Sequence, residues 1–433
     1  MREMKDSGIA WIGAMPRAWK MNTIAQIFLQ VKCKNTGLQE KNLLSLSYGK
    51  VKRKSIDTVE GLLPESFDGY NIIEKDDIVL RLTDLQNDHT SLRVGLAEER
   101  GIITSAYLTI RNRSNFCPKY LYYYLHSFDI AKGFYGMGAG VRQGLNWDGV
   151  KWLKILAPSV PKQERIAAFL DAECAEIDTV LEKTRASIEE YKKLKQAVIT
   201  QAVTKGIRGD RPMKNSGIEW IGDIPAEWDV VRQKYFWNTV ESGVSVNAAD
   251  KPVDNSEQYG VLKTSAVSKF VFIPTEHKQV NLEEYGRVSC PVRADSIIAS
   301  RMNTPELVGA CGYVQNNYPN LFLPDRLWQI TFKDGLSPKY AWYYLSGIRV
   351  RQYISSLSTG TSSSMQNISQ SQYGNIFITI PSIGEQSEIT KYLDEKCRSV
   401  DALVTKKQQY LTEIENYKKS LIYEYVTGKK EVV

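Results

Sequence analysis

The chain has 433 residues, of which 42% are hydrophobic and 24% charged, and its net charge is +7. This composition is typical of an ordered protein with more than one domain and excludes a wholly disordered chain. The sequence contains no apolar run of membrane-spanning length and no export signal, so we expect a cytoplasmic location. The six cysteines form no CxxC pair, which argues against a zinc site or a disulfide framework.

The positive charge is concentrated in the first part of the chain. Residues 1–160 hold 22 Lys and Arg against 16 Asp and Glu, a surplus of +6, whereas residues 211–380 hold 16 against 15, a surplus of +1. The segments 161–210 and 381–433 each hold 9 against 9. A modest basic excess suits a polyanionic partner, although many basic proteins bind no nucleic acid.

The first motif along the chain is MKDSGIAWIGAMPRAW at 4–19, and it returns as MKNSGIEWIGDIPAEW at 213–228. Two further stretches also recur in the same order, PKYLYYYL at 118–125 as PKYAWYYL at 338–345, and the segment from Pro158 as that from Pro381. This order indicates a tandem duplication of about 200 residues, a period far too long for a solenoid. We expect the tryptophans and prolines of the motif to pack the joint between a helix end and a globular block, with partner docking as the alternative.

The globular blocks mix strands and helices. The stretches at 42–56, 76–85 and 101–112 have the alternating or β-branched pattern of short strands, and those at 118–136 and 338–356 look like helices that begin at a proline. We therefore predict an α+β fold in which each block contains a curved antiparallel sheet. The predicted domains are 1–160 and 209–383.

Two long helices are predicted at 161–208 and 384–430, each with apolar residues at the 4–3 spacing of a coiled coil. Each has a Gly stop signal, Gly206 or Gly428, and Ser382 with Glu385 resembles a capping box. A helix of about 45 residues spans roughly 65 Å, so the short link at 206–213 favours antiparallel over parallel pairing, with a pseudo-two-fold axis. The predicted seam consists of Leu170, Ile177, Leu181, Ile188, Leu393, Val400, Val404 and Leu411.

Lys195 and Lys418 occupy seam positions in the two helices. A buried polar residue in a coiled coil can fix the register of the two helices. Alternatively, the two lysine stems extend along the seam and place their charges in solvent.

The sequence offers little for catalysis. The three histidines, His89, His126 and His277, lack the spacing of metal ligands, and no phosphate-binding, nucleophile-elbow or zinc-protease motif is present. We therefore expect no catalytic site and no metal in this chain.

Residues suited to DNA contact gather in a few stretches. YGKVKRKS at 48–55 holds four cations, while the Gly-rich loop at 136–147 and its Ser/Thr-rich counterpart at 358–369 both precede the repeated Pro-Ser. Arg and Gln can bond guanine and adenine edges in two places at once, although such loops and Lys runs are more often plain surface. The candidate DNA contacts are Lys50, Lys52, Arg53, Lys54, Arg142, Gln143, Lys263, Arg301, Asn303, Thr361, Ser363, Ser364 and Gln366, with Arg349 and Arg351 as further candidate cations.

The duplicated SGIEWIGDIPAEW motif, the loop before Pro-Ser, the RIAAFLDAECAEID helix start and the AVTKG helix end resemble the specificity (S) subunit of type I restriction–modification enzymes. The resemblance implies two target recognition domains that each read half of a split DNA site. It also implies a spacer of two antiparallel helices on which two modification subunits dock. The implied partners are therefore double-stranded DNA, the two modification subunits and, where the system has them, two restriction subunits. S-adenosylmethionine would then bind the modification subunit, and ATP and Mg²⁺ the restriction subunit.

Two other functions remain open. A stand-alone DNA-binding regulator would bind its site tightly without partners, whereas a specificity subunit would be poorly soluble or weakly specific alone. A coiled-coil scaffold without a nucleic-acid role would suit the nearly neutral second block.

Overall fold

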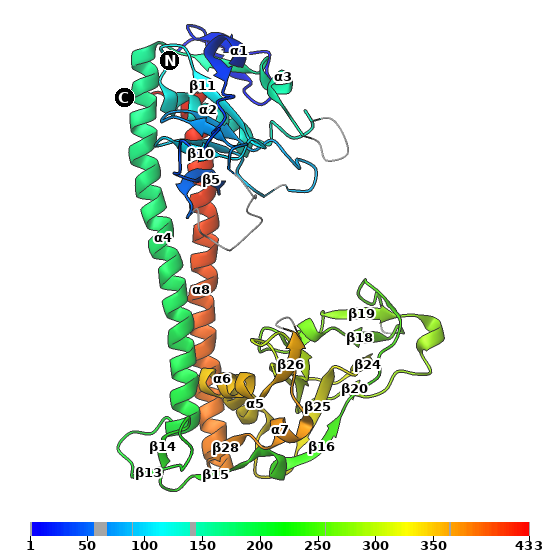
Figure 1. Ribbon diagram of the computed structural model, residues 1–433. Helices are drawn as coiled ribbons and strands as arrows, with labels where there is room; N and C mark the ends of the chain where they lie inside the picture. The colour runs from blue at the N-terminus through cyan, green and yellow to red at the C-terminus, as the bar shows by residue number, and fades with distance from the viewer. Residues whose placement is uncertain are drawn as a thin grey trace. The chain divides into compact units, whose positions relative to one another are not determined.

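The computed structural model describes residues 2–55, 67–88, 90–138, 144–255, 257–362 and 365–432. They form two compact units (Figure 1): the first comprises Met1–Arg185 with Gln408–Val433, and the second Ala186–Lys407. Both long helices, α4 (Val160–Lys205) and α8 (Ile383–Val426), contribute one segment to each unit. The helices therefore do not separate from the globular blocks as units of their own.

The first unit is built on the four-stranded antiparallel sheet β4-β11-β8-β9. The remaining strands form two-stranded pairs, β1-β2, β12-β3, β5-β6 and β10-β7. The strands are β1 (Met4–Asp6), β2 (Ala14–Pro16), β3 (Lys20–Thr23), β4 (Phe28–Gln30), β5 (Leu44–Ser47), β6 (Lys50–Arg53), β7 (Asn71–Ile73), β8 (Ile78–Leu80), β9 (Val94–Leu96), β10 (Gly101–Ile103), β11 (Leu108–Asn112) and β12 (Lys154–Ala157). The shorter helices are α1 (Ile24–Ile27), α2 (Pro118–Ile130) and α3 (Trp147–Val150).

The second unit repeats this sheet as β16-β25-β21-β23 and adds a five-stranded sheet, β17-β19-β18-β24-β20, and a small sheet, β22-β27-β26. The first group of strands is β13 (Met213–Asn215), β14 (Asp223–Pro225), β15 (Asp229–Arg232), β16 (Trp237–Glu241), β17 (Ala248–Ala249), β18 (Gly260–Leu262), β19 (His277–Val280) and β20 (Pro291–Val292). The second group is β21 (Ser296–Ser300), β22 (Met302–Asn303), β23 (Cys311–Val314), β24 (Tyr318–Phe322), β25 (Leu327–Phe332), β26 (Thr359–Ser362), β27 (Met365–Asn367) and β28 (Phe377–Ile380). The helices are α5 (Pro338–Ser346), α6 (Ile348–Leu357), α7 (Gln370–Gly374) and the 3₁₀ turns η1 (Gln233–Phe236), η2 (Thr264–Val267) and η3 (Leu282–Glu284).

The mixed α and β content agrees with the sequence prediction, but two details differ. β18 and β24 pair in parallel, so the sheets of the second unit are not all antiparallel. The helix expected at 338–356 is two helices, because Gly347 has the extended backbone angles φ −65° and ψ 140° and interrupts it. In the first copy, α2 has no break at Ser127, the counterpart of Gly347, but it ends at Ile130, short of the expected 118–136.

Within each unit the two long helical segments run antiparallel. In the first unit Asp178 pairs with Lys418 and Arg185 with Glu415, so residue numbers rise along one helix while they fall along the other. In the second unit Lys195 pairs with Asp401, and Arg208, just after α4, pairs with Glu388, which gives the same direction. The predicted seam residues Leu170, Ile177, Leu181, Ile188 and Leu393 are buried, and Val400, Val404 and Leu411 are partly buried.

The helix ends largely follow their sequence signals. Gly206 and Gly428 have φ of +74° and +73°, the left-handed backbone that ends many helices and that glycine adopts without strain. At the start of α8 the Ser382 hydroxyl accepts the Glu385 N–H at 3.3 Å. The Glu385 carboxylate does not complete the expected capping box, because it bonds the Trp228 indole and Arg211 instead.

The repeated tryptophan motif is structural in both units, as expected. Trp19 and Trp228 are 4% and 0% exposed and lie in the two largest apolar clusters. In the first unit the motif contacts the end of α8, where a Cβ on Gly428 would collide with Pro16 and Trp19. In the second unit it belongs to the same apolar cluster as the end of α4.

Candidate nucleic-acid interface

The basic stretch of the first unit forms β6 and the turn before it. Lys50, Lys52 and Arg53 are exposed, but two of them already have acidic partners. Arg53 donates to Glu99, Nε to Oε1 at 2.6 Å, and this bond raises the pKa of Arg53 and lowers that of Glu99. Lys50 lies 3.8 Å from Asp178. Within the described residues Lys52 has no ion pair, so it has the greatest freedom to meet a phosphate.

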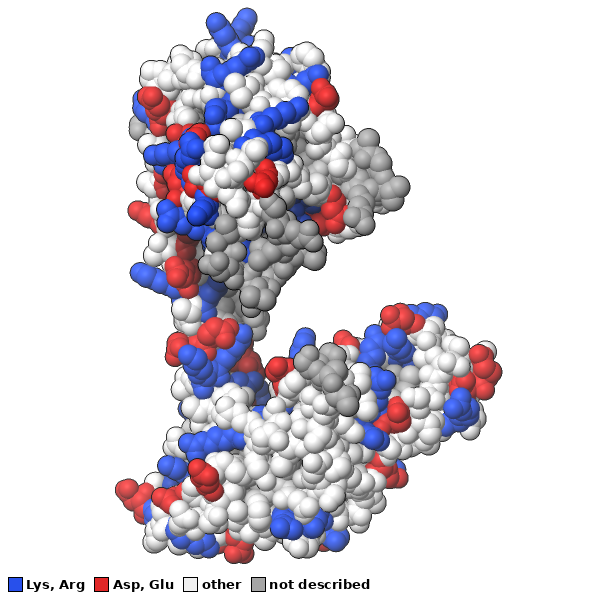
Figure 2. Space-filling view, in the orientation of Figure 1, with Lys and Arg blue, Asp and Glu red and all other residues white. Residues whose placement is uncertain are grey.

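The visible face of the first unit carries Lys and Arg side chains interspersed with fewer acidic ones, while much of the visible face of the second unit is uncharged (Figure 2). This pattern follows the sequence surplus of +6 in residues 1–160 and +1 in residues 211–380. Side chains that could attract phosphate groups are therefore more abundant in the first unit.

The Gly-rich loop of the first unit is tied to a second loop. The Leu145 N–H donates to the Leu82 carbonyl at 2.8 Å, so the end of the Gly-rich loop is fixed beside the β8–β9 connection. Arg142 and Gln143 lie outside the described residues.

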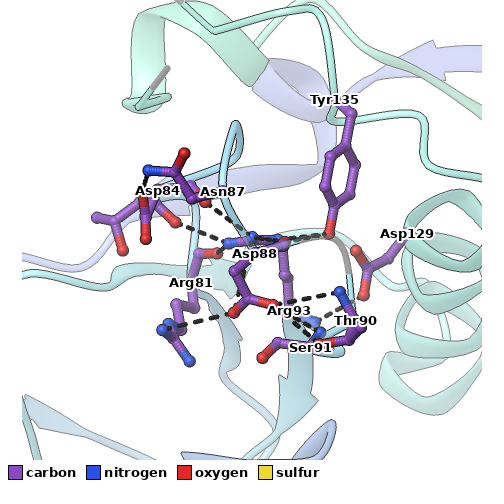
Figure 3. Close-up of polar contacts among 10 residues, drawn as sticks. Arg81, Asp84, Asn87, Asp88, Thr90, Ser91, Arg93, Asp129 and Tyr135 are labelled. Carbon is purple, nitrogen blue, oxygen red and sulfur yellow. Dashed lines mark hydrogen bonds and ion pairs between the residues drawn. The ribbon is translucent and has the colours of Figure 1, made fainter. Parts of the chain in front are cut away.

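Arg93 stabilises the β8–β9 connection through hydrogen bonds from its side chain, which is 0% exposed (Figure 3). Its guanidinium donates to the carbonyls of Arg81 (3.1 Å), Thr83 (2.7 Å), Asp84 (3.3 Å) and Asp88. Tyr135 joins the network, because Arg93 Nε lies 2.9 Å from its hydroxyl. A planar guanidinium with five N–H donors suits a loop that turns several carbonyls inward.

Two carboxylates beside this loop are shifted in opposite directions. The Ser91 hydroxyl and N–H hold the pKa of Asp88 well below its usual range. Burial raises the pKa of Asp129 to about 6, although its Oδ2 accepts the Arg93 N–H at 2.6 Å. The Oδ1 of Asp129 is buried without a hydrogen-bond partner.

In the second unit the candidate loops meet in one small sheet. β22 pairs with β27, with Asn303 opposite Gln366, and β26 continues the sheet with Thr361 in its strand. The Ile368 N–H donates to the Arg301 carbonyl at 3.0 Å, which matches the Leu145–Leu82 bond of the first unit. Ser363 and Ser364 lie outside the described residues.

The other nominated cations of the second unit lie elsewhere or face inward. Lys263 precedes η2 and pairs with Asp250 at 3.5 Å. The expectation that Arg351 supplies surface charge is wrong, because it is buried and donates to the carbonyls of Glu306 (3.2 Å) and Val308 (2.5 Å). Burial also lowers the pKa of this guanidinium. Arg351 thus holds the β21–β23 connection as Arg93 holds the β8–β9 connection.

Sequence reasoning missed Arg93 and misassigned Arg351. A buried arginine looks like a surface arginine in sequence, and these two occupy unrelated positions in the duplicated copies. The one signal of burial in the sequence was the position of Arg93, because this residue directly precedes an apolar strand.

Neither described histidine is placed to bind a metal. His126 is buried, and burial together with the nearby Lys418 charge lowers its pKa to about 4. His277 accepts the Val253 N–H at 3.0 Å and lies 2.7 Å from the Pro274 carbonyl. Among the described residues no cluster of His, Cys, Asp and Glu could hold a metal ion, and no helix has the length and apolarity to cross a membrane.

Comparisons with known proteins show what this chain is similar to. The family model described as "Type I restriction modification DNA specificity domain" matches residues 225–415. The protein named "Putative type I restriction enzyme MjaX specificity subunit", from Methanocaldococcus jannaschii, is 23% identical over 97% of this chain and 96% of its own length. The EcoEI specificity subunit of Escherichia coli is 24% identical over 43% of this chain and 32% of its own length.

A solved structure supports the fold. A chain from a study entitled "Structural basis underlying complex assembly and conformational transition of the type I R-M system" has a TM-score of 0.68 and 17% identity. The match covers 95% of this chain and 98% of that chain. The prediction of a non-catalytic specificity subunit agrees with these names. The resemblance inferred from sequence is thus confirmed: residues 225–415 match the specificity-domain model, and nearly the whole chain is similar to a protein named as a type I restriction enzyme specificity subunit.

Proposed function

We propose that this chain reads a two-part DNA site, with residues 1–160 reading one half and residues 209–383 the other. One observation carries the proposal. Each unit has the same central sheet, and beside it two loops joined by an equivalent backbone hydrogen bond, Leu145 to Leu82 and Ile368 to Arg301. The frame is repeated while the polar residues on it differ, which suits two different half-sites.

The proposed base contacts lie on these paired loops. Arg142 and Gln143 serve the first half-site, and Arg301, Asn303 and Gln366 the second. Thr361, Ser363 and Ser364 suit bases or phosphates. Lys50, Lys52, Arg53, Lys54 and Lys263 would contribute phosphate attraction in proportion to their freedom from acidic partners.

The helices at 161–208 and 384–430 would set the spacing between half-sites and dock two modification subunits, related by a pseudo-two-fold axis. Reciprocal ion pairs support this arrangement. Lys195 bonds Asp401 at 2.7 Å and Lys418 bonds Asp178 at 2.6 Å, and adding 223 to Lys195 and Asp178 gives Lys418 and Asp401. In this assembly the modification subunit binds S-adenosylmethionine, and a restriction subunit, where present, uses ATP and Mg²⁺.

The test is co-expression with the modification subunit and mapping of methylated adenines on DNA. We expect one adenine in each half of a split site, and we expect exchange of residues 301–310 and 358–369 to change one half alone. Tight, specific binding by the chain without partners would instead favour a regulator. A chain that assembles without any DNA methylation would favour a scaffold.

A further inference from the structure

The second unit contains a groove of about 890 Å³ beside the last turns of α4. Its wall includes Gln196 and Thr200 of α4, Ile221 of the repeated motif and Ile348 of α6. Ile348 is 46% exposed, and both Gln196 Oε1 and Thr200 Oγ1 are buried without a hydrogen-bond partner. Unpaired buried polar atoms are uncommon in folded proteins, so the packing of this wall is incomplete.

In the first copy, a tyrosine side chain fills the space that corresponds to this groove. The repeat offset of 223 makes Tyr423 the counterpart of Thr200. The Tyr423 hydroxyl donates to the carbonyls of Trp11 (3.1 Å) and Ile12 (3.2 Å), and its ring centroid lies 6.2 Å from that of Trp11. Trp11 and Ile12 correspond to Trp220 and Ile221 in the second copy. A phenol ring therefore fits between this helix and this motif, and the shorter Thr200 leaves its place open.

The residues at the edge of the groove also carry more positive charge than their counterparts in the first copy. Four cationic and two acidic residues line it, the cations being Lys192, Lys193, Lys205 and Arg349. Lys192 and Lys193 pair with Glu189 and Glu190 on their own helix. Lys205 and Arg349 are exposed and have no ion pair within the described residues.

The counterparts of these cations in the first copy carry no such charge. Adding 223 to Lys192, Lys193 and Lys205 gives Glu415, Asn416 and Gly428, and the lysine that follows Gly428, Lys429, donates to the Ala14 carbonyl of the motif. The open space and the positive edge therefore occur together, in the second copy.

We infer that this groove binds an acidic protein segment whose tyrosine side chain fills the space between Thr200 of α4 and the repeated motif, as the side chain of Tyr423 lies between α8 and that motif in the first copy. The apolar wall receives the ring, and Lys205 and Arg349 attract flanking carboxylates. The inference rests on the comparison of the two copies and stands whether or not the chain reads DNA.

The probe is a fluorescein-labelled peptide with the sequence Glu-Glu-Tyr-Leu-Glu-Glu, titrated with the full chain and followed by fluorescence anisotropy. We expect one binding site, with binding at least about tenfold weaker when the peptide tyrosine is alanine. Thr200→Tyr fills the groove with the side chain of the first copy and should also weaken binding at least about tenfold, without lowering Tm. Should Tm fall, the surface variant Arg349→Glu provides the same test.

Tyr423→Thr is the matched control. It opens the corresponding space in the first copy, where Glu415 and Asp129 stand in place of Lys192 and Arg349, so the chain should keep one site of unchanged affinity. Equal binding of the alanine peptide, unchanged binding to both Thr200→Tyr and Arg349→Glu, or no binding up to 1 mM peptide overturns the inference. Displacement of the peptide by a short single-stranded DNA also overturns it, because the groove would then serve a polyanion.

Discussion

The two units share a frame but stabilise their loops in different ways. In the first, one buried guanidinium, that of Arg93, bonds four carbonyls of the β8–β9 connection. In the second, β22, β26 and β27 form a sheet, and Arg351 bonds two carbonyls from the side of α6. The duplicated sheets and helix joints therefore tolerate different loops, and each loop carries its own support.

Among the changes that test this comparison, replacement of Arg93 by methionine should have the largest effect on the free energy of unfolding. It removes the donors for four carbonyls, three of which lie at 2.7–3.3 Å, and a buried acceptor left unpaired costs about 1–3 kcal/mol. We expect a loss of roughly 3–4 kcal/mol in the free energy of unfolding of the first unit. Hydrogen exchange at residues 81–91 should accelerate, and selection of bound duplexes should lose the first half-site.

Arg351→Met is the matched change in the second unit. Since it removes bonds to two carbonyls, we expect about half that loss, with faster hydrogen exchange at residues 301–310 and an intact first half-site.

Unchanged hydrogen exchange at residues 81–91 in Arg93→Met would contradict the first prediction, because it would show that other contacts stabilise the β8–β9 connection.

Asp129→Asn should stabilise the first unit. Burial raises the pKa of Asp129 to about 6, so its favourable contribution is present below pH 4 and is lost as pH rises through 6. An asparagine escapes this loss and still accepts the Arg93 N–H. At 1.36 kcal/mol per pKa unit, the expected gain at pH 7 is about 2–3 kcal/mol.

The pH dependence provides the check. The difference in unfolding free energy between Asp129→Asn and the wild type should grow from pH 4 to pH 7. The second copy has Arg349 at this position of the repeat, so no similar carboxylate complicates the comparison. A constant difference over this range would mean that Asp129 titrates normally.

The long helices were predictable from sequence, whereas the contacts that stabilise the loops were not. Heptad spacing and the two glycine stop signals predicted α4 and α8 because local periodicity determines a long helix. The pairing of Asn303 with Gln366 joins residues 63 positions apart, and no local pattern predicts such a register. The role of Arg351 depends on burial by tertiary packing, and a sequence with one Arg among many surface cations gives no sign of it.

The two reciprocal ion pairs should have smaller and similar effects. Lys418→Met and Lys195→Met each remove one interhelical pair whose lysine side chain is 23% or 28% exposed. We expect about 0.5–1 kcal/mol for each, less at high salt. Double-mutant cycles with Asp178→Asn and Asp401→Asn measure the coupling, and unequal coupling energies would show that the duplicated helices no longer have equivalent registers.

Removal of the Lys52 side chain should have the smallest effect on the protein, and this effect is on DNA binding. It tests whether the first unit is the main source of phosphate attraction. Lys52 is exposed, and the structure gives it no acidic partner in the described part of the chain, whereas Arg53 already bonds Glu99. Lys52→Ala should weaken DNA binding equally across sequences and reduce the salt slope by about 1. Arg53→Ala should reduce it less, because Glu99 neutralises that charge before DNA arrives. If Arg53→Ala has the larger effect, DNA must displace Glu99, and the β5–β6 hairpin then changes its ion pairs on binding.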